Sequence, residues 1–455
     1  MSDDVLTAAI EGRVHYPGEA GYDAAKGCWN VLWVHQPAVV VEAASVNDVV
    51  VALSHARRNG LKVAVQSTGH GVTVPADAET MLLVVAGLAS VEIDAGNQVA
   101  RIGGGATWAP VLAQAQRHGL APLLGSAPHV GAVGYTLGGG FGWLARRYGL
   151  AVDHVRSLRV VRADGWVVTA SRSSHPELFW ALCGGGGGSL GVVVEMEIGL
   201  VPVGEVYAGN LFYPIEDAAA VFDFYREWSE RQSADFTSAF TLMNFPPLEM
   251  VPAPIRGRSF ALLRGCHSGD GADGKAAVDE WRAWREPALD MFGPMPYAEC
   301  GEISADPVDP VPAIASGRWL THLDDDVLAA MLEAVTGGPG PSPLLMAETR
   351  HAGGAVTGPV PSACFEARGA DRMLELIALV MAPEAGVEAE RRISATWQRL
   401  AGHLPSLSGY LNFAEGAERQ TVAATAYTSD TRHRLAAVKA SVDPLGMFSN
   451  GVGHG

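Results

Sequence analysis

The most informative part of the chain is Lys62-Val63-Ala64-Val65-Gln66-Ser67-Thr68-Gly69-His70. Its first half alternates like a short strand, and its second half is a tight turn of small residues that ends on an imidazole. Small residues in such a turn expose consecutive backbone N–H groups, which form a nest for phosphate oxygens. Histidine can act there as a base or a nucleophile. The stretch predicts a phosphate grip beside a reactive histidine, as a nucleotide cofactor requires; the alternative is a loop with a surface histidine.

Two later segments are rich in glycine. The first begins Gly125-Ser126-Ala127-Pro128-His129-Val130-Gly131 and continues to Gly138-Gly139-Gly140-Phe141-Gly142-Trp143, and the second runs from Gly184 to Val193. Glycine lets a backbone approach a flat cofactor closely and aim its N–H groups at flavin or phosphate oxygens. Two such runs in one chain favour cofactor contact over the alternative of two flexible loops. No G-x-G-x-x-G motif opens a βαβ unit, so a Rossmann site is not indicated.

Three more motifs complete an ordered set: Tyr148-Gly149-Leu150-Ala151-Val152-Asp153, Tyr410-Leu411-Asn412-Phe413 and Asp443-Pro444-Leu445-Gly446-Met447-Phe448. With this set the chain resembles the FAD-linked oxidase family typified by vanillyl-alcohol oxidase, p-cresol methylhydroxylase and the berberine bridge enzyme. In length and layout it looks most similar to small bacterial members such as hydroxynicotine oxidase. The resemblance spans nearly the whole chain. It is specific in the flavin-binding half and weak between Val206 and Leu404, where substrate selection would reside.

The resemblance implies that FAD is the cofactor and that a covalent bond joins His70 to the C8 methyl group of its isoalloxazine. The family motif usually has arginine and a second glycine where this chain has Gln66 and Thr68. Relatives with two links carry a cysteine at the position of Ala127, so the resemblance implies a bond through His70 only. The residues expected to contact FAD are His70, Gln66, Ser67, Thr68, Gly69, Gly71, Gly125, Ser126, Ala127, His129, Val130, Gly131, Gly134, Gly138, Gly139, Gly140, Phe141, Gly142, Asp153, Val155, Gly187, Gly188, Gly191, Val192, Val193, Asn412 and Asn450.

Tyr410 is the predicted acceptor of the substrate proton, because in the family the Tyr-x-Asn-aromatic strand crosses the catalytic face of the flavin. A free tyrosine has a pKa of about 10, so Tyr410 would need a neighbouring cation or donor, for which Arg350, His351 and His129 are candidates. Glu348 and Arg350, on one predicted strand, are the other predicted catalytic residues. The alternatives are a tyrosine with its hydroxyl at the surface and a solvated charged pair on an exposed strand.

The composition limits the class of protein. The chain has 455 residues and a formal net charge of −17, so neither a nucleic acid nor an anionic membrane is an expected partner. No apolar run is long enough to span a bilayer, and the acidic Met1-Ser2-Asp3-Asp4 lacks the pattern of a signal peptide. The cysteines form no C-x-x-C pair, so we expect no metal site and reduced thiols in a cytoplasmic protein. The expected partners are a small-molecule substrate and dioxygen, with the protein a monomer or homodimer.

The pattern predicts an α+β protein of two domains. Residues 1–205 would form the N-terminal part of an FAD-binding domain of vanillyl-alcohol oxidase type. Residues 206–409 would form an inserted substrate domain of antiparallel sheet plus helices, and residues 410–455 a C-terminal segment that returns to the FAD-binding domain. The clearest predicted elements are a capped helix from Ser45 to Gly60, a hairpin at Ala163-Asp164-Gly165, and amphipathic helices at 215–230, 273–285 and 371–381.

Three functions are compatible with the sequence. The first is an FAD-dependent oxidase that removes a hydride from a carbon bearing a hydroxyl or an amine, and passes the electrons to dioxygen to give hydrogen peroxide. The second is a flavin-dependent tailoring enzyme of secondary metabolism that cyclises or desaturates a natural product. The third is a binding protein that keeps the fold without a flavin. Fold alone cannot choose among them, because function depends on the site.

Overall fold

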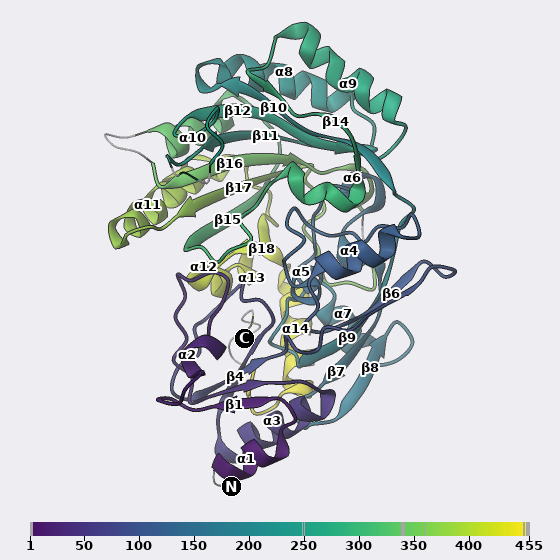
Figure 1. The fold of residues 1–455 in the computed structure, drawn as a ribbon, viewed down its shortest axis with the longest axis vertical. Helices are drawn as coiled ribbons and strands as arrows, with labels where there is room; N and C mark the ends of the chain where they lie inside the picture. Colours follow the sequence, from purple (N-terminus) through teal and green to yellow (C-terminus); the bar gives the residue numbers. More distant parts are fainter. Residues whose placement is uncertain are drawn as a thin grey trace.

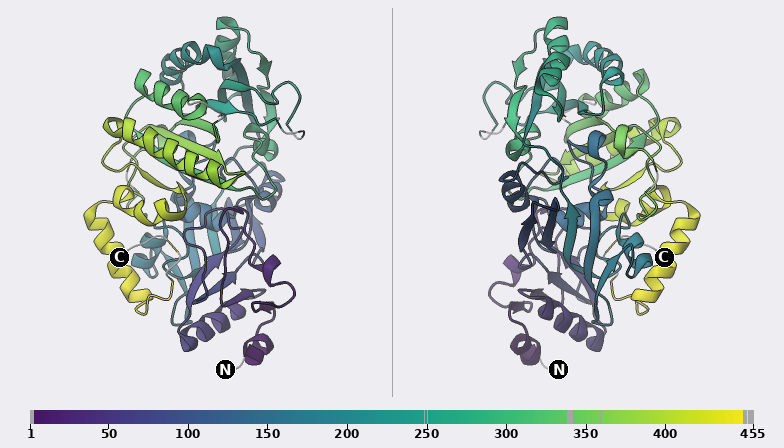
Figure 2. Two further views of the ribbon diagram at one scale, coloured as in Figure 1. Left: turned by 90° about the vertical axis from the view of Figure 1, so that its left-hand side faces the viewer. Right: turned by 90° about the vertical axis from the view of Figure 1, so that its right-hand side faces the viewer.

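The computed structural model describes residues 3–247, 249, 251–337, 342–358, 360–448 and 451. Figure 1 shows an elongated molecule with the N-terminal residues at one end and the middle of the chain at the other. The C-terminal helices return alongside the N-terminal half, as the side views in Figure 2 confirm. Three sheets organise the molecule, two in the N-terminal half and one in the inserted half. The predicted mixture of helices and sheets, with an antiparallel substrate sheet, is confirmed.

The first sheet supplies the strand that leads into the phosphate-binding turn. Its order is β1 (Arg13–His15), β2 (Val39–Glu42), β4 (Thr80–Val84), β3 (Lys62–Gln66), with β2, β4 and β3 parallel. The parallel strands β2 and β3 are joined through α3 (Val46–Asn59), since such a pair needs a long crossover. The predicted caps are confirmed: Ser45 accepts a hydrogen bond from the Asp48 N–H, and Gly60 ends the helix in the left-handed conformation. Two short helices, α1 (Asp3–Ala9) and α2 (Tyr22–Ala25), flank this sheet.

The second sheet is antiparallel and completes the N-terminal half. Its order is β5 (Val91–Asp94), β6 (Val99–Gly103), β9 (Val192–Gly199), β7 (Val155–Val161), β8 (Val167–Ser171). The predicted hairpin is the β7–β8 connection. The helices between these strands are α4 (Trp108–Gln116), α5 (Ala132–Leu137), α6 (Ala145–Tyr148), η1 (Ala151–His154) and α7 (Pro176–Leu182). One large hydrophobic core joins these elements to the cavity-facing side of the inserted half.

The third sheet forms the inserted half. Its order is β13 (Leu289–Asp290), β10 (Glu205–Pro214), β12 (Ser259–His267), β11 (Phe236–Asn244), β16 (Leu344–His351), β17 (Arg372–Leu379), β15 (Ala313–Leu320), β18 (Gly409–Ala414), with β14 (Gly293–Pro296) beside β10. One face packs against α8 (Ala218–Arg231), α9 (Gly271–Trp284), α10 (Asp325–Thr336) and α11 (Pro383–Arg399). The other face is turned toward the N-terminal half (Figure 1). Short 3₁₀ turns complete this half: η2 (Ile215–Asp217), η3 (Tyr297–Ile303), η4 (Gly354–Val356) and η5 (Ala401–His403).

One predicted helix is wrong. Residues 371–381 contain the strand β17, which lies between β16 and β15 in the middle of the third sheet. Helices cover one face of this strand and the N-terminal half covers the other, so most of its residues are buried. A run that is apolar on both sides has no strict alternation, and such a run cannot be told from a buried helix by its period. The correction matters because β17 carries a residue of the site.

The C-terminal segment belongs to both halves. Its first strand, β18, pairs with β15 at the edge of the third sheet, whereas α14 (Ser429–Val442) packs against α7 of the N-terminal half. Two short helices, α12 (Gly416–Thr421) and α13 (Ala423–Ala426), connect them. The chain therefore leaves the third sheet after Ala414, slightly later than the expected boundary at residue 410.

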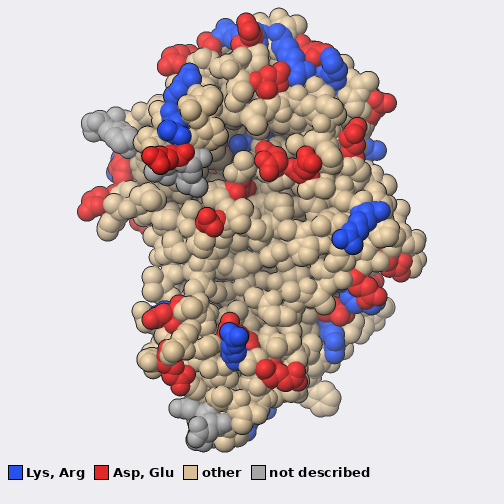
Figure 3. All heavy atoms as spheres, in the orientation of Figure 1, with Lys and Arg blue, Asp and Glu red and all other residues tan. Residues whose placement is uncertain are grey.

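The charge distribution on the surface and the state of the cysteines are those of an ordinary globular chain. On the face drawn in Figure 3, acidic and basic side chains are interspersed around both ends, and a broad band between them carries few charges. All of the cysteines are free thiols. Among the described helices, none combines the length and the apolar character needed to cross a bilayer.

Candidate active site

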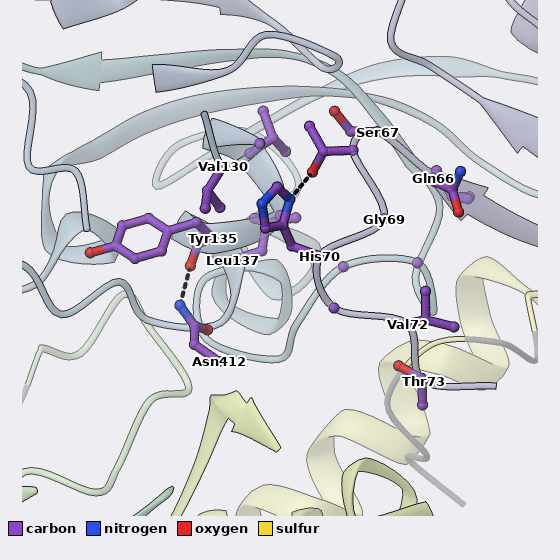
Figure 4. Close-up of a pocket in the computed structure, with 18 of the residues that line it drawn as sticks. Gln66, Ser67, Gly69, His70, Val72, Thr73, Val130, Tyr135, Leu137 and Asn412 are labelled. Carbon is purple, nitrogen blue, oxygen red and sulfur yellow. Dashed lines mark hydrogen bonds between the residues drawn. The ribbon is translucent and has the colours of Figure 1, made fainter. Parts of the chain in front are cut away.

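A cavity of about 330 Å³ extends from the turn after β3 to the cavity-facing side of the third sheet. It gathers residues from both halves of the molecule, and Figure 4 shows the part around His70 and Asn412. Most of the residues expected to contact FAD line it, although they come from segments far apart in the sequence. They are residues 66–71, Gly125, Ser126, Ala127, Val130, Gly131, Gly134, Phe141, Gly187, Gly188, Gly191, Val193 and Asn412.

The turn after β3 carries unused hydrogen-bond donors. Gly69 has a φ of 76°, and a Cβ built on it would lie 2.2 Å from Cβ of Cys28, so the position requires glycine. The carbonyls of Thr68 and Gly69 accept hydrogen bonds from a neighbouring loop. The backbone N–H groups of residues 68–71, in contrast, donate to no other residue that the structure describes. A run of consecutive free N–H groups beside a cavity is an anion-binding nest.

His70 is held as a neutral imidazole. Its ring stacks on Trp29 with centroids 4.3 Å apart, and Nδ1 lies 2.7 Å from the hydroxyl of Thr68 (Figure 4). Nε2 is buried and has no hydrogen-bond partner among the described residues. Burial, with a smaller effect of the nearby His129, lowers the pKa of His70 to about 3. At neutral pH the ring therefore keeps a nitrogen lone pair, which is what a nucleophile needs.

Several glycines of the first glycine-rich segment serve packing instead of lining the cavity. A Cβ on Gly138 would lie 1.7 Å from Oδ1 of Asn412, and one on Gly142 would lie 1.8 Å from a backbone carbonyl. Gly139 and Gly140 have positive φ angles and would clash with neighbouring aromatic rings. These glycines let the strand that carries Asn412 approach closely, and Asn412 then donates to the carbonyl of Tyr135 at 2.9 Å. None of these four glycines lines the cavity, and their direct contact with FAD stays a prediction.

Four other expected FAD contacts do not line the cavity. Asp153 forms a buried ion pair with Arg368, Val155 begins β7, and Val192 packs into the core beneath the first sheet. His129 lies beside His70, with ring centroids 5.2 Å apart, but does not itself reach the cavity. Asn450 lies outside the described residues. The glycine pattern therefore marks the neighbourhood of the cavity, but it does not distinguish residues that line the cavity from those one layer behind.

Tyr410 is placed away from the cavity. Its hydroxyl accepts a hydrogen bond from the backbone N–H of Phe141 at 2.9 Å, and the side chain is 1% exposed. Burial raises the pKa of Tyr410 well above its ordinary value, and the neighbouring donors and Arg350 offset only part of that rise. A phenol that is fully buried, already hydrogen-bonded and hard to ionise is a poor proton acceptor. The geometry therefore gives Tyr410 a structural role between the two halves, against the sequence-based prediction.

A row of polar and charged side chains crosses the third sheet toward the cavity. Arg264 donates to Glu348 Oε2 at 3.0 Å, and Arg350 donates to Glu348 Oε1 at 2.7 and 3.1 Å. Thr241 also donates to Glu348, and Asn210 accepts from Arg264. Burial opposes ionisation of Glu348, but Arg350 and Arg264 outweigh it and hold the pKa below its usual range.

This row assigns different roles to the two predicted catalytic residues. Glu348 is 1% exposed and does not line the cavity, whereas Arg350 does. Both oxygens of Glu348 are already used, so it is a fixed anion that orients Arg350 and is unsuited to accept a proton. The alternative of a solvated pair on an exposed strand is wrong, because both side chains are buried.

Glu375 is the residue that sequence reasoning missed. It lies on β17 directly opposite Glu348 and lines the cavity. Its carboxyl group makes no hydrogen bond to another described residue. Burial raises the pKa of Glu375 to about 8, with Arg350 opposing that shift. A carboxyl group that faces a cavity and titrates near neutral pH is suited to accept or hold a proton. No local sequence signal marks it, because its strand was predicted as a helix.

Comparison with known proteins identifies what this cavity is for. Residues 37–171 match a protein family described as an FAD binding domain. The chain is 36% identical over 202 residues to (R)-6-hydroxynicotine oxidase of Paenarthrobacter nicotinovorans, a match that covers 44% of each chain. Residues 37–171 therefore form an FAD-binding domain, and the chain is similar to FAD-linked oxidoreductases. The family resemblance expected from the motifs is thereby confirmed.

Solved structures extend the similarity of this oxidoreductase to its whole fold. It superposes on 6-hydroxy-D-nicotine oxidase of Arthrobacter nicotinovorans with a TM-score of 0.82 at 24% identity, over 96% of both chains. It superposes on BBE-like 1 of Physcomitrella patens with a TM-score of 0.81 at 21% identity, covering 98% of this chain and 97% of that chain. By sequence, the chain spans about half the length of the first curated relatives it matches.

The residues of the oxidoreductase fit FAD. The free N–H groups of residues 68–71 suit the pyrophosphate, and the orphaned ring nitrogen of His70 lies in the same turn. Gly187, Gly188 and Gly191 line the cavity without side chains that would block a flat or extended group. At the other end Arg350 and Glu375 remain available to a substrate. The cavity thus joins a cofactor-binding wall to a wall of ionisable side chains.

Proposed function

We propose that this protein is an FAD-dependent oxidase that removes a hydride from a carbon bearing a hydroxyl or an amine in a small organic metabolite. Dioxygen is the proposed electron acceptor and hydrogen peroxide the product. Bound FAD would supply the hydride-accepting chemistry, while the protein binds, orients and moves protons. The observation that carries the proposal is the cavity itself, which joins the nest at residues 68–71 to the free carboxyl group of Glu375.

Glu375 is the proposed base. Hydride leaves a carbon more readily when the attached O–H or N–H loses its proton, and a buried carboxylate facing the substrate can take it. A base with a pKa of about 8 is ionised in only a fraction of molecules at neutral pH and in most molecules above pH 8. Arg350, held in place by Glu348, would orient a substrate oxygen, while the negative charge of Glu348 offsets the effect of Arg350 on Glu375. The reaction should therefore accelerate as pH rises through about 8.

A single covalent link through His70 is part of the proposal. A C–N bond between a ring nitrogen and the C8 methyl carbon replaces a C–H and an N–H bond, so two electrons and two protons leave, and dioxygen takes them. The neutral ring and its unpartnered nitrogen support this step. Mass spectrometry of the unfolded chain should show one FAD adduct on the peptide that contains His70. Flavin-loaded protein with an unmodified His70 would remove the link from the proposal and leave the oxidase proposal standing.

The decisive experiment is an anaerobic flavin-reduction screen on the purified holoprotein. Alcohols, amines, sugars and phenolic metabolites are mixed with the protein, and bleaching of the flavin absorbance is followed. Substrates that bleach it are then tested in air for hydrogen peroxide, with one peroxide expected per product molecule. Product mass separates simple oxidation from ring closure or desaturation. A preparation that binds no flavin after reconstitution would overturn the proposal.

A further inference from the structure

Three side chains with metal-binding atoms meet away from the cavity, on the helix-covered side of the third sheet. His322 and Asp324 lie in the connection from β15 to α10, and His403 lies in η5, which follows α11. The backbone N–H of Thr321 donates to the carbonyl of His403 at 2.9 Å, which fixes the two segments to each other. The helices α10 and α11 pack together beside them (Figure 1). None of the three side chains lines the cavity.

The ligand atoms converge on one carboxylate oxygen. Nε2 of His322 lies 3.2 Å from Oδ2 of Asp324, and Nε2 of His403 lies 2.9 Å from the same oxygen. One ligand atom from each residue lies within 4.8 Å of the others. Ligands about 2.0–2.1 Å from a tetrahedral zinc ion are about 3.3 Å apart. An ion would require shifts of a few tenths of an ångström along the two edges to Asp324, and it would also draw together the two histidine nitrogens, which lie within 4.8 Å of each other.

Thr321 orients the ring of His322 for metal binding. Its hydroxyl oxygen lies 2.8 Å from Nδ1 of His322 and 3.1 Å from the carbonyl of His403. The hydroxyl has one proton, and it satisfies both neighbours only if it donates to the carbonyl and accepts from an Nδ1–H group. When the ring is neutral, an Nδ1–H group leaves the lone pair on Nε2 of His322, beside the Asp324 carboxylate. A second hydrogen bond that fixes the tautomer in this way is typical of metal-binding histidines.

Asp324 caps a helix and also faces both histidines. Oδ1 accepts hydrogen bonds from the backbone N–H groups of Asp326 and Val327 and so caps α10. Nε2 of His403 lies 3.0 Å from Oδ1 and 2.9 Å from Oδ2, and Nε2 of His322 lies 3.2 Å from Oδ2. A proton on Nε2 of His322 satisfies its contact with Asp324, and so does a cation bound between the two groups.

We propose that His322, Asp324 and His403 form a binding site for a divalent transition ion of the zinc type. Two imidazoles and one carboxylate are an established donor set for such ions, with the fourth position open to water. The side chain of His322 is 56% exposed, so solvent reaches this position, while that of His403 is 12% exposed and anchors the site. The ion would clamp the start of α10 to the end of α11. The site is independent of the cavity and of the flavin.

Zinc binding to tag-free holoprotein tests the proposal. The protein is dialysed against a chelator, and zinc is titrated by calorimetry and by competition with a chromophoric chelator. We expect one saturable zinc per chain and a melting temperature that rises with free zinc, as linkage requires. His403→Ala and His322→Ala should each weaken binding at least tenfold and abolish that rise. Asp324→Asn should do the same while keeping a competent helix cap.

Two further variants separate metal binding from a structural role. Thr321→Val removes the hydroxyl that orients His322 and should weaken zinc binding about 10- to 100-fold without removing a ligand. His118→Ala removes an exposed histidine outside the cluster and should leave binding unchanged. Cobalt in place of zinc should give visible absorption bands that disappear in His322→Ala, which changes an exposed side chain and keeps the fold. No saturable binding up to 100-fold molar excess of zinc, or binding unchanged in both histidine variants, would overturn the proposal.

Discussion

The two walls of the cavity use different parts of the polypeptide. The N-terminal wall is made of backbone: free N–H groups at residues 68–71 and glycines that allow close approach. The wall on the third sheet is made of ionisable side chains that neutralise one another, ending in the free carboxyl group of Glu375. The first wall therefore depends on shape and the second on charge. An added carbon atom should damage the first, and a lost charge or proton should damage the second.

The largest effect is expected from Gly69→Ala on the backbone wall. The new Cβ would overlap Cβ of Cys28 at 2.2 Å on a backbone with a φ of 76°, so the turn has to move. We expect loss of most of the bound FAD, measured as flavin absorbance per chain after purification. Gly60→Ala is a matched control, because its φ is 68° but nothing lies within 4 Å of the new Cβ. It should cost about 1 kcal/mol of stability and keep full FAD content. Equal FAD content in both variants would refute the shape argument.

The next effect concerns proton transfer on the charged wall. Glu375→Gln should slow flavin reduction by about 10²- to 10⁴-fold and leave FAD content intact, because only the base is lost. The rise in rate through about pH 8 should disappear with it. Stopped-flow reduction under anaerobic conditions measures both. Tyr410→Phe is the comparison, since it keeps the ring and removes a hydroxyl that accepts from backbone N–H groups at Phe141 and Gly140, and it should stay within about tenfold of the wild type. If Tyr410→Phe slowed flavin reduction more than Glu375→Gln did, Tyr410 would be the better candidate for the base.

Removing the central anion of the row should destabilise the fold. Glu348→Gln leaves Arg264 and Arg350 buried without a counter-charge, and breaking a buried pair in this way costs about 3–5 kcal/mol. Urea unfolding of the holoprotein measures the change in free energy. Glu390→Gln, at an exposed position of α11, is the control and should change it by less than about 0.5 kcal/mol. If Glu348→Gln were as stable as this control, the charge of Glu348 would not be needed to stabilise the buried arginines beside it.

The effect that is smallest per unit change is a pH dependence of stability. The folded chain holds a proton on Glu375 up to about pH 8, whereas an unfolded glutamate releases it at about pH 4.3. Stability from this group is therefore complete below about pH 4.3 and is lost as pH rises through 8, by at most about 1.4 kcal/mol per pH unit. Glu375→Gln should flatten this part of the profile between pH 5 and 8. Thermal unfolding across that range measures the slope, and identical slopes would show that Glu375 is ionised throughout.

The parts of the site that depend on local chemistry could be predicted from the sequence. The turn that ends at His70 and the glycine-rich segments are recognisable because phosphate and flavin contacts need small residues in short stretches. The helix from Ser45 to Gly60 was equally accessible, since its caps are local. The family and the fold followed from the order of these motifs.

The parts of the site that depend on strand pairing could not be predicted from the sequence. Glu348 meets Arg264 only because β16 and β12 flank β11, and Glu375 meets the cavity only because β17 is a strand. The hydroxyl of Tyr410 accepts a hydrogen bond from Phe141, a residue 269 positions away, and no local motif reveals that contact. The proposed metal site has the same origin, because His403 reaches His322 and Asp324 through the packing of two helices.

The position of β18 has a consequence for how the chain is made. This strand closes the edge of the third sheet by pairing with β15, and its Asn412 touches Tyr135 in the other half. Both contacts join the end of the chain to residues that leave the ribosome much earlier. A nascent or truncated chain that stops before Gly409 exposes the unpaired edge of β15, and such edges promote aggregation. Synthesis of the last segment is thus the step that pairs the edge of β15 and removes this risk of aggregation.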